Sequence, residues 1–256
     1  MSTAATPSDL PAPRPLAATA PGLGRLTAVE LRKMVDTRAG AWLLGITAAL
    51  TLAVAVIAVF AFPDEDARLL DFFAIATLPS TLLLPVIGIL LVTSEWSQRT
   101  AMVTFTLVPR RLRIFAAKLL AGLALSGAAF VLSLVAGVAM TAAAAGDWSF
   151  SFALGVQGAV SVVVPMLAGI GFGAVLLASA PAIVLYYVLP AAWSALGSIP
   201  AVESVAEWLD QARTMTPLLE ETLSSGQWAR VATSLALWLA LPLAVGCWRI
   251  AKADVR

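Results

Sequence analysis

The residues best suited to a chemical role lie in one polar stretch between two apolar blocks, residues 94–118 (SEWSQRTAMVTFTLVPRRLRIFAAK). The stretch contains a single acid, Glu95, and an apolar run, TAMVTFTLV. Five basic residues accompany them: Arg99, Arg110, Arg111, Arg113 and Lys118. Basic residues here help to fix membrane topology, but that role leaves the apolar run unexplained. Apolar and charged side chains together suit the docking of a partner protein, and we expect such a site here.

Covalent and metal chemistry have few residues available to them. The chain has no histidine and one cysteine, Cys247, which excludes an internal disulfide, the usual Cys/His zinc sites and any triad with an imidazole base. No lysine stands in a Gly-Lys-Ser/Thr phosphate loop, because the three lysines follow Arg32, Ala117 and Ala251. We therefore predict no catalytic residue, no metal site and no cofactor bound by this chain, and we do not expect an enzyme.

The composition is that of a membrane protein. Of the 256 residues, 60% are hydrophobic and only 12% are charged, and the mean hydropathy is +0.92. Soluble domains carry about 25% charged residues, and 31 charges cannot cover a soluble protein of this size. The net charge of +1 leaves no basic excess for binding nucleic acid.

The lengths of the apolar blocks predict an all-α protein with six transmembrane helices. Blocks of 22 or more residues without a charge are long enough to cross a hydrocarbon core about 30 Å thick. Residues 154–198 contain no charge and are long enough for two spans, with a break at Ala180-Pro181. The predicted spans are residues 41–62, 72–93, 119–143, 154–178, 181–198 and 228–248. They form one domain, residues 25–250, between a disordered tail at 1–24 and a short tail at 251–256.

The distribution of charge predicts the orientation. Thirteen of the 16 basic residues fall before the first span, between the second and third, or after the last, and ten of the 15 acids fall in the other loops. By the positive-inside rule, both termini and residues 94–118 are expected to be cytoplasmic, in a multi-pass protein of the plasma (cytoplasmic) membrane. Two termini on one side require an even number of spans, which agrees with six.

Two further segments are predicted to be amphipathic helices at the membrane surface. In residues 25–40 the apolar side of a helix would carry Ala28, Leu31, Met34, Val35 and Ala39, although an ordinary basic juxtamembrane stretch is an alternative. In residues 199–227, an external helix is expected with its apolar side on the membrane. Its apolar positions are Val202, Val205, Trp208, Leu209 and Ala212, opposite Glu203, Glu207 and Asp210.

The predicted spans have small residues but no ionisable residue in their interiors. Gly169 and Gly173 form a GxxxG pair that allows close helix packing, although such pairs arise often by chance in an alanine-rich chain. Lys118 and Arg230 are expected at span edges, with Lys118 at the aqueous end of the third span. Ion-driven transporters usually place ionisable groups at mid-membrane, so coupling to an ion gradient is disfavoured.

Residues 94–118 resemble a known family, the membrane subunits (permeases) of type-two ABC transporters, particularly their actinobacterial branch. That family shows an acid and an aromatic residue, a Gly-Thr pair, a threonine-rich apolar run, Pro-Arg-Arg and Ala-Lys, in this order. The matching residues are Glu95, Trp96, Thr100, Thr104, Thr106, Pro109, Arg110, Arg111, Ala117 and Lys118, with Arg99 where the family has glycine. The segments ELRKMVDTRAGAWLL and GIGFGAVLLASAPAI are also similar to the family's interfacial helix and to its fourth and fifth spans.

The resemblance implies a six-span permease that exports a hydrophobic or amphipathic small molecule or lipid, as a homodimer or paired with a related permease. A separate ATPase subunit would bind ATP and magnesium and drive transport. It would couple to the permease through Glu95, Arg99, Thr100, Pro109, Arg110 and Arg111, and through Glu30, Arg32 and Lys33 of the interfacial helix. The alternatives are import, a channel, and a polytopic scaffold without ATP-driven transport.

Overall fold

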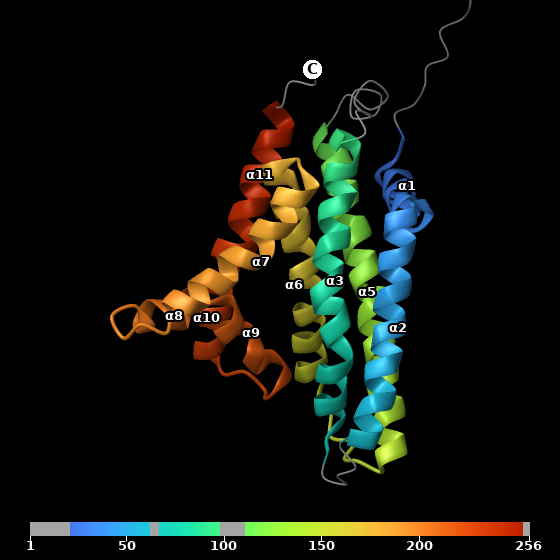
Figure 1. Cartoon of the computed structure of the whole chain (residues 1–256), viewed down its shortest axis with the longest axis vertical. Coiled ribbons are helices and arrows are strands. Elements are labelled where there is room, and N and C mark those ends of the chain that lie inside the picture. The colour runs from blue at the N-terminus through green and yellow to red at the C-terminus, as the bar shows by residue number, and fades with distance from the viewer. Residues whose placement is uncertain (1–20, 62–66, 98–110, 253–256) are drawn as a thin grey trace, which may run out of the picture.

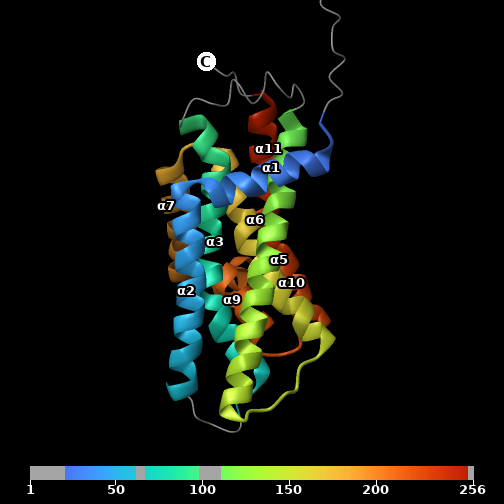
Figure 2. The same ribbon diagram turned by 90° about the vertical axis from the view of Figure 1, so that its right-hand side faces the viewer.

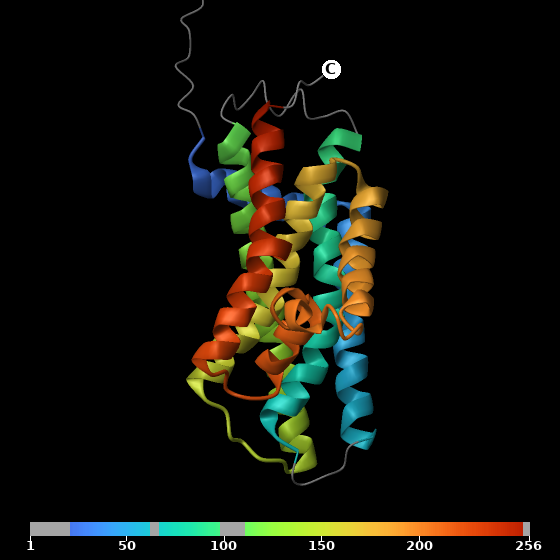
Figure 3. The ribbon, with the colours of Figure 1, turned by 90° about the vertical axis from the view of Figure 1, so that its left-hand side faces the viewer.

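The computed structural model describes residues 21–61, 67–97 and 111–252, and these residues form an all-α protein. Six helices are long and apolar enough to cross a membrane, as predicted. The first five are α2 (Arg38–Ala61), α3 (Leu69–Ser97), α5 (Arg111–Ala144), α6 (Phe152–Leu176) and α7 (Ser179–Leu196). The sixth is continuous through α10 (Ser225–Leu235), the π-helical turn η3 (Ala236–Ala240) and α11 (Leu241–Lys252), as Figure 3 shows.

Helices α3 and α6 form the centre of the bundle (Figure 1). In the most apolar 18-residue stretch of each helix, 61% of the residues are buried in α3 and 67% in α6, against 17% in α2 and 11% in α7. The two central helices touch along their backbones: a Cβ atom on Gly169 of α6 would lie 2.3 Å from the carbonyl oxygen of Pro85 of α3. Gly173, one turn later, faces Ile89 of α3. The Gly169/Gly173 pair therefore packs two helices of the same chain.

An additional helix, α1 (Leu23–Asp36), crosses the outside of the bundle near one end (Figure 2). The prediction placed a helix over residues 25–40, but α1 ends at Asp36 because Thr37 has an extended backbone. The chain then turns sharply into α2. Only glycine fits at position 40 in this turn, since a Cβ atom there would lie 1.9 Å from the carbonyl oxygen of Met34. The end of α3, the start of α5 and the end of α11 lie at the same end of the bundle as α1 (Figure 1).

The segment between the fifth and sixth spans differs from the single surface helix that was predicted. It contains two short helices, α8 (Glu203–Leu209) and α9 (Gln211–Met215), and a 3₁₀ turn, η2 (Thr216–Leu219). Asp210, expected on the polar outer side, is instead buried and caps α9 by accepting hydrogen bonds from the backbone N–H groups of Ala212 and Arg213. Val205 and Trp208, expected on one apolar face against the membrane, remain exposed in the chain, while Ala206 is buried.

This segment packs beside the half of the bundle away from α1, where it is seated against α6 (Figure 1). Gln157 of α6 holds it in place with a fully buried side-chain amide. The amide nitrogen donates to the carbonyl oxygens of Leu218 and Glu221 at 3.1 and 2.7 Å, and the amide oxygen accepts from the N–H of Leu223 at 3.0 Å. One polar side chain thus satisfies three backbone groups that burial would otherwise leave unpaired.

Candidate functional site

Four charged side chains meet where α1 crosses the bundle, and we call Glu30, Lys33, Glu95 and Lys118 the charge cluster. Glu30 and Lys33 come from α1, Glu95 from the last turns of α3, and Lys118 from the first turns of α5. The side chains of Lys118, Glu30 and Glu95 are only 4%, 5% and 8% exposed, whereas that of Lys33 is 39% exposed. The cluster contains two acids and two bases, which is the pairing that burial of charge demands.

Lys118 makes three hydrogen bonds within the charge cluster and its surroundings. Its ammonium group donates to Glu30 Oε2 at 2.7 Å, to Glu95 Oε1 at 3.1 Å and to the carbonyl oxygen of Leu91 at 2.9 Å. An ammonium group has three hydrogens, so each has an acceptor. Lys118 therefore joins all three helices at one atom.

Lys33 makes the second connection between α1 and α3. Its ammonium group lies 2.7 Å from Glu30 Oε1 and 2.7 Å from Glu95 Oε1. Burial alone would lower the pKa of Lys33, but the hydrogen bonds that Lys33 donates to Glu30 and Glu95 outweigh it and raise the pKa above the usual value of 10.5. Lys33 is therefore charged at neutral pH and holds the two carboxylates together.

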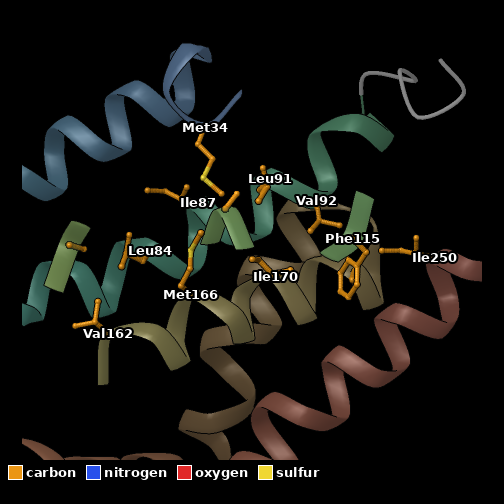
Figure 4. Packing of buried hydrophobic residues seen from close by; sticks show 13 residues of the cluster. Met34, Leu84, Ile87, Leu91, Val92, Phe115, Val162, Met166, Ile170 and Ile250 are labelled. Carbon is orange, nitrogen blue, oxygen red and sulfur yellow. The ribbon is translucent and has the colours of Figure 1, made fainter. Parts of the chain in front are cut away.

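Apolar packing fixes the geometry around the charge cluster. Met34 of α1 points towards Ile87 of α3, and Phe115 of α5 lies beside Val92 and Ile250 (Figure 4). A hollow beside the cluster has a mixed lining, which consists of Val92, Glu95, Trp96, Arg111, Ile114, Phe115, Lys118 and Ile250. The end of α11 packs beside the same residues, because Arg111 at the start of α5 donates a hydrogen bond to the carbonyl oxygen of Ile250.

The predicted docking residues have different positions in the structure. Glu95, Glu30 and Lys33 meet in the charge cluster, and Arg111 is the first residue of α5. Arg32 lies apart from them, exposed and paired with Asp36 at 3.3 Å. The remaining predicted residues, Arg99, Thr100, Pro109 and Arg110, lie outside the described residues.

The sequence pattern predicts Lys118 at the aqueous end of a span that starts at residue 119. In the structure α5 begins at Arg111, and Lys118 is buried within the chain instead of exposed to water. Lys118 therefore lies about 10 Å inside the helix, at 1.5 Å per residue, and faces inward. The sequence does contain a signal for this: Ile114, Phe115 and Ala121 each lie three or four residues from Lys118, and all four residues are buried on one face of α5.

The arrangement suits mechanical linkage between helices. Among the described parts of the chain, no three or more His, Cys, Asp or Glu side chains are grouped so that they could hold a metal ion. The charge cluster instead ties a helix outside the bundle to the ends of two spanning helices, so movement of one requires movement or rupture of the others. Its members lie at the end of the bundle where the chain between α3 and α5 leaves it.

Fold and site together define a multi-pass, all-α membrane protein with a charge-linked helix across one end of its bundle. The sequence matches no protein-family model and no curated protein sequence.

Proposed function

We propose that this chain is the transmembrane subunit of an ATP-driven transporter of the type-two ABC class, powered by a separate ATPase subunit. The single observation that carries the proposal is the charge cluster. It connects α1 to both ends of the stretch 94–118, because Glu95 lies in α3 and Lys118 in α5, and the motif order of this stretch resembles that class. A partner that binds this stretch would act on all three helices together.

The burial of Glu95 sharpens its role in this proposal. Its carboxylate is occupied by Lys33 and Lys118 inside the chain, so Glu95 acts as a positioning residue, transmitting force to α1. In this mechanism the ATPase dimer closes, pushes on the end of the bundle between α3 and α5, and the charge cluster carries the movement to α1. Tilting of the helices then opens a path for a hydrophobic or amphipathic cargo between two permease subunits.

Co-expression with the ATPases encoded beside its gene tests the class. We expect one of them to co-purify with this chain in detergent and to support ATP-dependent transport in vesicles. Failure of every such ATPase to associate would overturn the proposal, and flux without ATP would favour a channel.

A matched pair of variants tests the role of the charge cluster. Lys33→Gln removes the ammonium group between Glu30 and Glu95, whereas Arg68→Gln breaks an exposed pair with Asp71 at the other end of the bundle. We expect Lys33→Gln to retain the ATPase but lose most of the transport, and Arg68→Gln to behave as the wild type. Equal transport by the two variants would show that the cluster does not carry the movement.

A further inference from the structure

Helix α1 has three distinct faces, and only one of them is used by the bundle. Glu30 and Met34 are buried against the bundle. At 100° per residue, Ala28 and Val35 fall on an adjacent edge that contains no charged residue, and both are exposed. Val29 falls on the opposite edge, between the charged residues Lys33 and Asp36. The uncharged edge is therefore an apolar surface that nothing within the described chain covers.

The residues that follow α1 indicate that the lipid bilayer contacts this uncharged edge. After the sharp turn at Thr37, α1 is followed by the spanning helix α2, whose first turns carry an exposed tryptophan, Trp42, with 72% of its surface accessible. Tryptophan is typical of the boundary between hydrocarbon and headgroups. Arg38 precedes Trp42 by one helical turn and is also exposed, so a cation follows the aromatic ring towards the aqueous side.

The charges near the exposed edge of α1 indicate which class of lipid headgroup it would bind. Arg32 is neutralised by Asp36 at 3.3 Å, and Glu30 is committed to the charge cluster. Arg25 of α1 and Arg38, the first residue of α2, are exposed, and neither forms an ion pair with any residue that the structure describes. Two uncompensated guanidinium groups, which match phosphate geometry well, thus flank an uncharged edge.

We propose that α1 is a binding surface for anionic phospholipid, with Ala28 and Val35 in the boundary layer and Arg25 and Arg38 on lipid phosphates. Because the charge cluster fixes α1 to α3 and α5, the lipid charge on this leaflet then contributes to the position of these helices. The inference requires a membrane but no ATPase, so it stands or falls independently of the transport proposal.

Thiol labelling in nanodiscs tests this proposal on the whole protein. With Cys247→Ala removing the one native cysteine, Ala28→Cys and Val29→Cys report the two edges of α1 to a neutral, membrane-impermeant maleimide. The lipid is phosphatidylcholine alone or with about a third phosphatidylglycerol. An arginine near an anionic surface contributes about 1 kcal/mol, which is about five-fold in equilibrium constant.

We expect phosphatidylglycerol to slow labelling of the cysteine at position 28 by up to about 25-fold, which is the five-fold effect of one arginine multiplied by that of the other. The labelling rate at position 29 should stay unchanged. High salt and the double variant Arg25→Gln/Arg38→Gln should both abolish the slowing. The control Arg68→Gln/Arg230→Gln removes two exposed arginines away from α1 and should leave it intact. Equal rates in the two lipids, equal protection of positions 28 and 29, or loss of the effect in the control would each overturn the proposal.

Discussion

Replacing Lys118 by methionine tests the energetic reasoning behind the charge cluster. Methionine is about as long as lysine and apolar, so the change removes the charge with little loss of volume. Glu30 and Glu95, at 5% and 8% exposure, then face each other with only Lys33 left between them. Breaking a buried ion pair on one side costs about 3–5 kcal/mol, because the remaining charge stays buried without its partner. We expect Lys118→Met to lower the free energy of unfolding by about this amount.

The assay is unfolding in mixed micelles of increasing SDS content, followed by the fluorescence of the eight tryptophans. The control is Arg68→Gln, which breaks an exposed pair at 2.9 Å and should cost less than about 1 kcal/mol. The triple variant Glu30→Gln/Glu95→Gln/Lys118→Met removes both buried carboxylates along with the lysine and should recover at least half of the loss. A cost for Lys118→Met no larger than that of the control, or no recovery in the triple variant, would refute the argument.

Three further predictions concern other parts of the structure. Gln157→Leu leaves three buried backbone groups without partners and should cost about 2–4 kcal/mol of unfolding free energy in the same assay; a cost below 1 kcal/mol would contradict the role of this amide. Gly169→Ala places a methyl group 2.3 Å from a backbone oxygen of α3 and should lower thermal stability, whereas Gly127→Ala, with open space around it, should be neutral or stabilising; the reverse order would refute the close contact. Because the pKa of Lys33 is raised in the folded protein, its charge stabilises the docking of α1 fully below pH 10.5, and this contribution is lost as the pH rises through the higher folded pKa. Proteolysis of α1 should therefore accelerate only above about pH 10.5 in the wild type. The Lys33→Gln variant should show no such step.

The six spans were predictable because length and the absence of charge are properties of each block by itself. The block of 45 uncharged residues, 154–198, divides at Leu177, close to the predicted break. Leu177 adopts a left-handed backbone conformation and ends α6, and Pro181 lies in the first turn of α7. Pro181 was the signal for this break in the sequence, and the observed end of α6 lies only a few residues from the predicted break.

The charge cluster was only half predictable. The resemblance drew attention to all four residues of the cluster but not to their mutual contacts. Lys118 was expected at an aqueous end because a lysine next to an apolar block usually ends a span. Its burial depends on Glu30, which lies 88 positions earlier in the chain. A single-helix pattern contains no information about a partner on another helix, and for the same reason the burial of Asp210 under Ser194 was missed.

The order in which the chain is made gives the charge cluster one further property. Glu30, Lys33 and Glu95 all precede Lys118 in the sequence, so both of its carboxylate partners are already synthesised when α5 leaves the ribosome. Lys118, the most buried cation among the described residues, therefore enters after its counter-ions and need not cross into a low-dielectric environment alone. If the two acids were in α6 or α7, the ammonium group of Lys118 would stay unpaired until the second half of the protein had been synthesised.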